Sequence, residues 1–147
     1  MAYSIFHLVT AGNVPYDLTL ISDSVYKRNI LHYAVINKER DLIDLIVSKV
    51  DSDRKELRNA EDTKGKKPAD YDQSSQFAEY FNTVWDYAKE GNIRKLKLSL
   101  DSGRFEVDEQ TMLLKNTPLH VAVRFQQLET IKTLIYDYQA DPTLVNS

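Results

Sequence analysis

The sequence contains no cysteine and only three histidines among its 147 residues. Without cysteine it can form no disulfide, no thiolate metal site and no cysteine nucleophile. The three histidines, His7, His32 and His120, do not occur in a zinc-binding spacing such as H-E-x-x-H. We therefore expect neither a metal ion nor another cofactor to bind this chain.

The sequence also lacks clusters of like charge and long apolar runs. Its 19 lysines and arginines are interleaved with 22 aspartates and glutamates, which gives a net charge of -3. A nucleic-acid-binding domain normally gathers lysine and arginine on one face, and that pattern is absent here. The apolar runs are far shorter than the roughly 18 to 20 residues of a membrane-spanning helix, and the start has no signal-peptide pattern. We expect a soluble protein that binds no nucleic acid and does not insert into a membrane.

The chain does contain a short motif that recurs. Residues 117–122 read T-P-L-H-V-A, residues 29–34 read N-I-L-H-Y-A, and residues 65–71 repeat the pattern faintly as G-K-K-P-A-D-Y. Thr117 is a residue type that favours the N-cap of a helix, and Pro118 fits the first helical position. Apolar residues follow each of the first two motifs at spacings of three and four, which predicts a second amphipathic helix after each. Each motif therefore marks a helix-turn-helix unit.

The first of these motifs matches the T-P-L-H-x-A signature of the ankyrin repeat letter for letter, and the whole chain resembles an ankyrin-repeat domain. The resemblance implies an all-α fold, with a single domain over residues 1–147 forming a solenoid of about four to five helix-turn-helix units. The units are expected at residues 3–23, 24–50, 60–82, 83–108 and 112–146, with the third one degenerate. In the last unit, Gln139 replaces the usual glycine, and the segment leaving the second helix is one residue longer than usual.

The middle of the chain departs from this pattern. Apolar residues at helical spacing run from residue 76 to residue 90 without a glycine or proline between them, which predicts one continuous helix. It would serve as the second helix of the third unit and the first helix of the fourth, so the joint near residue 82 should be irregular. The apolar stripe of this helix is expected in the core, and it comprises Phe77, Tyr80, Phe81, Val84, Trp85 and Ala88.

A highly charged stretch, residues 51–62, lies between the second and third units. We expect an exposed linker there, with a short solvated helix as the alternative. Carboxylate neighbours such as Asp51 and Asp53 should then lie in polar surroundings, where a raised pKa is not expected. They are interpreted as solvated surface and not as acid–base catalysts.

The resemblance implies recognition of another protein and no catalysis. Ankyrin repeats bind partners through the tips of the loops before each inner helix and through the concave face of the inner helices. The matching loop-tip positions are Tyr26, Arg28, Thr63, Lys64, Lys66, Leu113, Leu114 and Asn116. The matching concave-face positions are Ile36, Asn37, Ser74, Ser75, Lys89, Glu90, Arg124 and Phe125. The apolar members of these sets would form a binding patch if they gather on the surface, and the alternative is that they pack against neighbouring loops.

The resemblance also implies structural roles for four conspicuous residues. His32 and His120 occupy the position of the family's histidine, whose ring hydrogen-bonds loop backbone and ties adjacent units together. Thr117 and Pro118 start the inner helix of the last unit. No residue is assigned to catalysis, to a cofactor or to a metal.

Two alternatives to an interaction scaffold remain open. The chain could be a structural subunit embedded in a large assembly, or the targeting arm of a longer enzyme or effector. Its last unit ends where another repeat would begin, so further repeats or a subunit contact are expected to cover Ile131 and Leu134 at this C-terminal edge. The resemblance favours a cytoplasmic location in either case.

Overall fold

The computed structural model describes residues 22–53 and 55–147, and the structural statements below concern these residues. Within them every regular element is a helix, which confirms the all-α prediction. The chain divides into two compact units, residues 1–81 and residues 82–147, which we describe separately. The repeat expected at residues 3–23 lies almost entirely outside the described residues.

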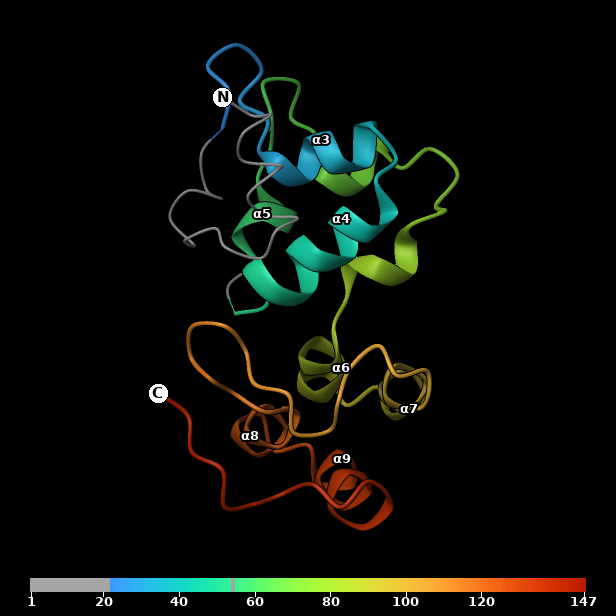
Figure 1. The fold of residues 1–147 in the computed structure, drawn as a ribbon, viewed down its shortest axis with the longest axis vertical. Helices are drawn as coiled ribbons and strands as arrows, with labels where there is room; N and C mark the ends of the chain where they lie inside the picture. Colours follow the sequence, from blue (N-terminus) through green and yellow to red (C-terminus); the bar gives the residue numbers. More distant parts are fainter. Residues whose placement is uncertain (1–21, 54) are drawn as a thin grey trace. The chain divides into compact units, whose positions relative to one another are not determined.

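The first unit is built around helix α3 (Ile30–Ile36), which begins after an N-cap residue (Figure 1). The side-chain oxygen of Asn29 accepts hydrogen bonds from the amides of Leu31 and His32, at 2.9 and 3.1 Å, and so satisfies two donors that the helix itself leaves unpaired. Helix α3 packs against three other elements of this unit, and two of them make the larger contacts with it. These two are α4 (Arg40–Leu45), which continues as the π-helical turn η1 (Ile46–Val50), and the 3-10 helix η2 (Pro68–Tyr71). The short helices α5 (Glu56–Asn59) and η3 (Ala78–Phe81) complete the unit.

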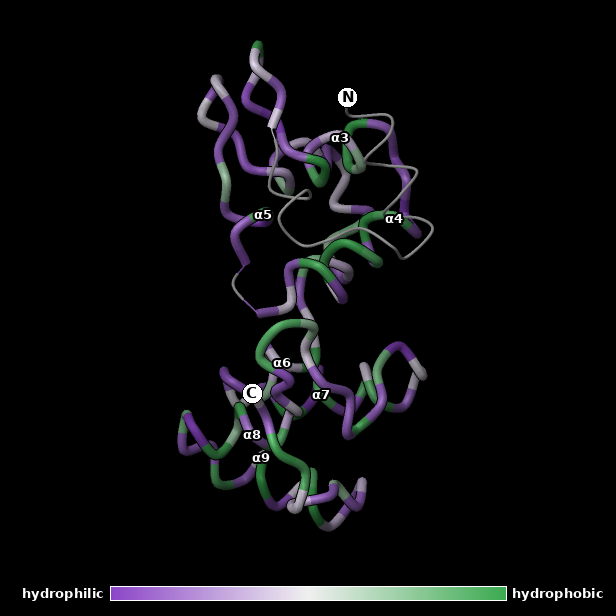
Figure 2. The backbone as a smooth tube through the Cα atoms, turned by 60° about the vertical axis from the view of Figure 1, so that its left-hand side comes forward, coloured by the Kyte–Doolittle hydropathy of each residue, from purple (hydrophilic) through white to green (hydrophobic). Residues whose placement is uncertain are grey.

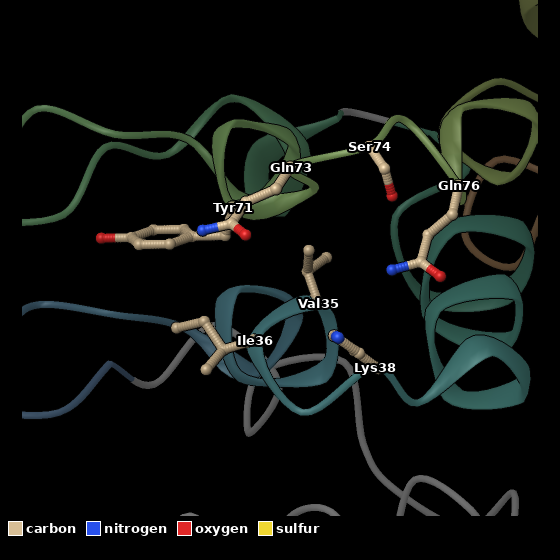
Figure 3. A pocket seen from close by; sticks show the side chains of 7 residues that line it. All are labelled: Val35, Ile36, Lys38, Tyr71, Gln73, Ser74 and Gln76. Carbon is tan, nitrogen blue, oxygen red and sulfur yellow. The ribbon is translucent and has the colours of Figure 1, made fainter.

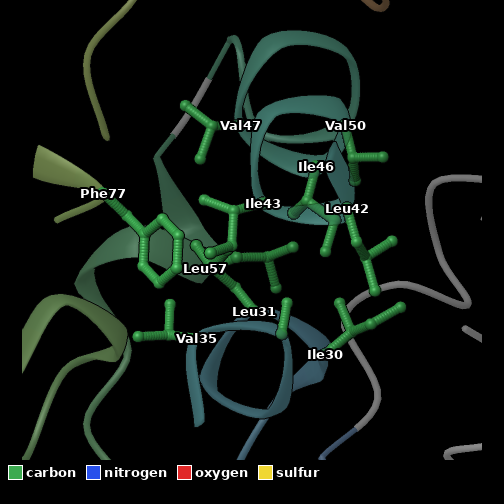
Figure 4. Close-up of a cluster of buried hydrophobic side chains, with 11 residues drawn as sticks. Ile30, Leu31, Val35, Leu42, Ile43, Ile46, Val47, Val50, Leu57 and Phe77 are labelled. Carbon is green, nitrogen blue, oxygen red and sulfur yellow. The ribbon is translucent and has the colours of Figure 1, made fainter. Parts of the chain in front are cut away.

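The core of the first unit lies between α3, α4 and α5 (Figure 4). Leu31, Ile43 and Ile46 are fully buried there. Phe77 reaches the same core from the segment before η3. The buried apolar set is Ile30, Leu31, Ala34, Val35, Leu42, Ile43, Ile46, Val47, Val50, Leu57 and Phe77. The apolar stripe of the second helix therefore faces α3, as its spacing requires.

The second unit contains two helix pairs (Figures 1 and 2). Helix α6 (Val84–Glu90) packs against α7 (Ile93–Asp101) and also against α8 (Pro118–Arg124). Helix α8 packs in turn against α9 (Leu128–Lys132), which continues as the π-helical turn η4 (Thr133–Asp137). Trp85 is 4% exposed, and its ring packs edge-on against that of Phe105, with the two ring centres 5.3 Å apart. The tube in Figure 2 shows hydrophobic and hydrophilic residues alternating along these helices, as expected when one face of each is buried.

The prediction of one continuous helix over residues 76–90 is wrong. The chain forms the 3-10 helix η3, and α6 starts anew with Thr83 as its N-cap. The Thr83 hydroxyl accepts from the Asp86 amide at 3.3 Å, and the Asp86 carboxylate accepts from the Thr83 amide at 2.7 Å. Because the Thr83 amide donates to the Asp86 carboxylate, it is not used for a backbone hydrogen bond of a continuous helix, and the helix is interrupted at residue 82. Phe77 consequently belongs to the core of the first unit, whereas Val84, Trp85 and Ala88 belong to the core of the second.

The prediction that residues 51–62 form an exposed linker is also wrong. Asp51 is 0% exposed, and its carboxylate accepts hydrogen bonds from the amides of Leu57 and Arg58 and from the Arg58 Nε, all between 2.9 and 3.0 Å. The Arg58 guanidinium also donates to the carbonyl of Phe81 at 3.0 Å. Burial raises the pKa of the Asp51 carboxyl, although these hydrogen bonds and the Arg58 charge act in the opposite direction. The charged stretch therefore folds around one buried ion pair, which alternating charges in the sequence did not reveal.

The extra residue expected after the second helix of the last unit is taken up inside the helix. Helix α9 widens into η4, and a π-helical turn accommodates one residue more than an α-helical turn. The helix then ends with a hydrogen bond of 2.9 Å from the Ala140 amide to the Leu134 carbonyl. Gln139, just before Ala140, has a φ of 56°, in the left-handed region that favours glycine. The chain thus keeps the backbone shape of a glycine-terminated helix without the glycine.

We predict that Arg58→Ala lowers the free energy of unfolding by about 3 to 5 kcal/mol. The substitution leaves the Asp51 carboxylate buried without its cationic partner, and removing one member of a buried pair costs that much. Urea denaturation of the full chain measures the change, with Glu61→Ala, which alters an exposed residue of the same segment, as the control. A loss below about 1 kcal/mol for Arg58→Ala would contradict the assigned role of the ion pair.

We predict that Gln139→Gly raises the free energy of unfolding by up to about 1 kcal/mol, because glycine adopts a positive φ without the steric cost that a side chain adds. The matched control is Arg94→Gly in the exposed face of α7. That change should lower stability by about 1 kcal/mol, since glycine is unfavourable inside a helix. Thermal unfolding of both variants separates the two effects, and a shift of both in the same direction would refute the backbone argument.

Candidate functional site

Two of the loops predicted to contact a partner lie side by side in the first unit. One precedes α3 and holds Tyr26, the other precedes η2 and holds Thr63, and the Thr63 amide donates to the Tyr26 carbonyl at 2.8 Å. The exposed side chains of these loops include the predicted residues Tyr26, Thr63, Lys64 and Lys66. The fold of this unit therefore brings predicted loop-tip residues from two separate loops to one place.

Arg28, also predicted at a loop tip, is engaged within the protein. Its guanidinium carbon lies 4.5 Å from the centre of the Tyr26 ring and 5.1 Å from that of the Tyr71 ring. The guanidinium donates to the Tyr71 hydroxyl at 3.2 Å, and its Nε lies 3.4 Å from a carboxylate oxygen of Asp62. Only 16% of the side chain is exposed. Arg28 thus cross-links the two loops, and its contribution to any binding surface is to hold the loop tips in position.

Asp62, which the sequence analysis missed, is the acceptor at the centre of this cross-link. Its side chain is 1% exposed, and burial opposes its ionisation, but hydrogen bonds to the carboxylate outweigh that effect. The donors are the Tyr71 hydroxyl, the amides of Lys66 and Lys64, and Arg28. Together they hold the pKa of Asp62 well below its usual 3.8. The order Asp-Thr-Lys-Gly was an available signal, because aspartate and glycine favour the first and fourth positions of a turn.

The two motif histidines occupy equivalent surroundings in the two units. In the first unit, His32 Nδ1 accepts from the Asn29 amide at 3.1 Å, and its Nε2 lies 2.9 Å from the Lys66 carbonyl oxygen. In the second, His120 Nδ1 accepts from the Thr117 amide at 2.9 Å, and its Nε2 lies 2.9 Å from the Leu144 carbonyl oxygen. Since Nδ1 accepts, the ring proton resides on Nε2, which donates to the carbonyl. Each ring joins the start of an inner helix to a loop that follows it in the chain.

Thr117 and Pro118 both lie at the start of α8. The Thr117 hydroxyl accepts from the His120 amide at 3.2 Å, and Pro118 occupies the first helical turn, where no amide is needed. Both residues are buried. They belong to the framework that carries the surface of the second unit.

The predicted concave-face residues of the first unit border a pocket of about 320 Å³ (Figure 3). Ile36, at the end of α3, is half-buried, and Asn37, Ser74 and Ser75 are exposed. The pocket, which we call the α3–η2 pocket, is lined by Val35, Ile36, Lys38, Tyr71, Gln73, Ser74 and Gln76. Two residues predicted for the concave face, Ile36 and Ser74, line this pocket, and their binding role stays a prediction. The sequence did not indicate the other lining side chains, because their neighbourhood depends on how η2 packs on α3.

In the second unit, an exposed aromatic ring lies between two cations. Phe125 ends α8 and is 42% exposed. The Lys89 Nζ lies 5.0 Å from the centre of its ring, and the Arg124 guanidinium carbon lies 5.7 Å from it. The Gln127 amide group donates to the Lys89 carbonyl at 2.8 Å and so links the end of α6 to the turn after α8. We call Lys89, Arg124 and Phe125 the Phe125 surface; Glu90, also predicted here, is exposed beside Lys89.

The predicted loop tip of the second unit is in contact with the last residues of the chain. The Ser147 amide donates to the Leu114 carbonyl at 2.9 Å, and the Asn146 side chain donates to that of Asn116 at 2.7 Å. Leu113 is half-buried and Leu114 is 38% exposed. This loop is therefore partly covered by the chain itself, and Leu113, Leu114 and Asn116 offer less free surface than Phe125.

Leu134 needs no outside cover, whereas the further repeats or subunit contact expected at the C-terminal edge stay a prediction. Leu134 is 0% exposed, and Ile131 packs against the same core. The exposed apolar residues of this helix are instead Leu128, Ile135 and Tyr136, at 60%, 36% and 78%.

Residues 22–53 and 55–147 contain neither a candidate metal-binding cluster nor a candidate membrane-spanning helix. No group of three or more histidine, aspartate or glutamate side chains there is arranged to hold a metal ion. No helix in that part of the chain has the length and apolar character needed to cross a membrane.

Residues 114–147 match the family model of the ankyrin repeat, a segment that includes α8, α9 and η4. No curated protein sequence matches the chain.

We predict that the contribution of Asp62 to stability depends on pH. Because its pKa is lower in the folded than in the unfolded chain, the stabilisation is present above the usual value of 3.8 and is lost as the pH falls below it. The difference in unfolding free energy between the wild type and Asp62→Asn should therefore be constant from about pH 7 to about pH 5 and shrink below about pH 4. Urea titrations at each pH measure it.

The control for this experiment is Asp41→Asn, because the Asp41 side chain is fully exposed. Its small effect should show no comparable loss in acid. A wild-type to Asp62→Asn difference that stays the same down to about pH 2.5 would rule out the assigned hydrogen bonds to the carboxylate.

Proposed function

We propose that this chain, an ankyrin-repeat protein by the match over residues 114–147, is a non-enzymatic module that binds another protein. Within each unit the binding surface consists of the loop tips and the concave face of the inner helices, which are α3 in the first unit and α6 and α8 in the second. The likeness of the His32 and His120 environments supports treating the helix pairs as successive units of one ankyrin solenoid, with about four to five units over residues 1–147. We place the protein in the cytoplasm, in keeping with the family.

The observation that carries this proposal is the Phe125 surface. Phe125 is 42% exposed, so part of its ring lacks the apolar contacts that it would make in a core. It lies at the end of α8, the helix that packs against α6. Aromatic and arginine side chains are the usual energetic anchors of protein interfaces. Lys89 and Arg124 keep their charged groups beside the ring, so a partner that covers Phe125 also meets two cations. This combination suits a partner that presents apolar and acidic groups together.

A second candidate function, a subunit embedded in a larger assembly, is favoured by a different surface. Leu128, Ile135 and Tyr136 are exposed along α9 and η4, and their spacing places them along one side of that helix. An apolar strip of this kind is typical of a contact between subunits or between neighbouring repeats. The targeting arm of a longer enzyme or effector would use either surface in the same way.

The proposal predicts that Phe125→Ala weakens partner binding at least about tenfold, because truncating a central aromatic anchor costs more than about 1.4 kcal/mol. The partner is first captured from native extract by a photo-crosslinking amino acid placed at Glu90 and identified by mass spectrometry. Calorimetry with the purified pair then compares the wild type with Phe125→Ala. Circular dichroism of the free variant confirms that the fold is intact, since an exposed side chain should cost little stability.

The matched control is Tyr136→Ala, which removes an exposed aromatic side chain from the other surface. We expect this variant to bind the partner as the wild type does. If Tyr136→Ala loses binding and Phe125→Ala does not, the result supports the assembly subunit and overturns the concave-face interface. If native extract yields no protein partner, the proposed function as a whole fails.

A further inference from the structure

The α3–η2 pocket combines an apolar floor with a polar rim (Figure 3). Val35 and Ile36 come from α3 and face Tyr71 and Gln73 across the pocket. Val35 is only 2% exposed, so the floor belongs to the packed core and is rigid. Lys38, Ser74 and Gln76 close one end of the pocket in Figure 3. The rim residues come from the turn after α3 and from the loop after η2.

The rim side chains have hydrogen-bonding capacity that the protein does not use. Lys38, Gln73, Ser74 and Gln76 are all exposed. Among residues 22–53 and 55–147, none of these four side chains has a hydrogen bond or an ion pair, although the backbone around them is well paired. Polar side chains that converge on an apolar floor without partners of their own are the usual composition of a binding pocket.

Among the described residues that line the pocket, Lys38 is the only charged one. Among the described residues Lys38 forms no ion pair, and this includes Asp72 of the rim loop. The Asp72 carboxylate already accepts hydrogen bonds from the amides of Gln76 and Phe77, at 3.0 and 2.9 Å. Lys38 therefore presents to the pocket an ammonium group that has no carboxylate partner among the described residues, in a protein whose net charge is -3. Its electrostatic complement is an anionic group.

We propose that this pocket binds an acidic residue of the partner protein together with a neighbouring small aliphatic side chain. The carboxylate pairs with Lys38, the aliphatic group lies on Val35 and Ile36, and the side chains of Gln73, Ser74 and Gln76 hydrogen-bond the peptide backbone. A volume of about 320 Å³ is at the low end of ligand pockets, which matches one or two residues and excludes a large cofactor. The inference rests on the proposed function and adds the chemistry of the partner segment.

The test uses the isotope-labelled full chain and three short synthetic peptides, which differ only in the residue after valine. Their sequences are GGSVESGG, GGSVQSGG and GGSVKSGG, and binding is followed by two-dimensional nitrogen–proton NMR. This method detects weak complexes, and the side-chain amides of Gln73 and Gln76 report directly on the pocket. We expect the glutamate peptide to shift these signals and those of residues 35–38. Its affinity should be about fivefold higher than that of the glutamine peptide, because one solvent-accessible ion pair contributes about that much to binding.

Variants decide whether Lys38 is the recognition group. Lys38→Gln should remove the roughly fivefold preference for glutamate, and Lys38→Arg should keep it. The matched control is Lys95→Gln on α7, which changes the net charge equally at an exposed site of the second unit and should keep the preference. Raising the salt concentration should reduce the preference for the wild type.

Several results would overturn the inference. Equal binding of all three peptides would do so, as would shifts confined to residues outside the pocket or a preference unchanged by Lys38→Gln. The inference also fails if no peptide binds while the crosslinked partner still depends on Phe125, and in that case the proposed function stands. If the glutamate peptide binds at the pocket and no protein partner is found, the pocket chemistry stands and the proposed function fails.

Discussion

The hydrogen bonds of the motif histidines connect the elements on which the candidate surfaces lie. In each unit one ring nitrogen accepts from the N-cap amide, and the other donates to a loop carbonyl 24 or 34 residues further along the chain. A carbonyl withdrawn from water needs such a donor, or folding would leave it unsatisfied. One imidazole thus stabilises the start of a helix and sets the position of a loop. Both α3 and α8 are fastened in this way.

The candidate surfaces follow from this framework. In the first unit, the loop fixed by His32 is also held by Arg28 and Asp62, so the remaining side chains at the loop tips face outwards on a rigid base. Below these loops, the packing of η2 on α3 leaves the α3–η2 pocket. In the second unit, α6 and α8 pack side by side and present Phe125 between two cations. A rigid base reduces the entropy lost on binding, which favours recognition by these surfaces.

The region around residue 82 shows what apolar periodicity can and cannot predict. The apolar spacing over residues 76–90 identified the core side chains well, because Phe77, Val84, Trp85 and Ala88 are all buried. It could not show that they enter two different cores, since a helical stripe has the same spacing in either case. The signal for the break was present, because Thr83 followed three residues later by Asp86 is a capping pair. The helix cap at Thr83 interrupts the apolar stripe, and the residues before and after the cap pack into different cores.

The starts of the inner helices and the residue types at their caps could be read from the sequence, because those interactions join residues two or three positions apart. Asn29, Thr117 and the two motif histidines are legible for that reason. The folded structure was needed to show that Asp51 is buried with Arg58, that Arg28 is engaged with Asp62, and that Lys38 lies at a pocket without a partner of its own among the described residues. These contacts depend on how the folded chain brings together residues that are 7 or 34 positions apart in the sequence. Burial and charge pairing across such distances are properties of packing, which a local pattern of residues does not encode.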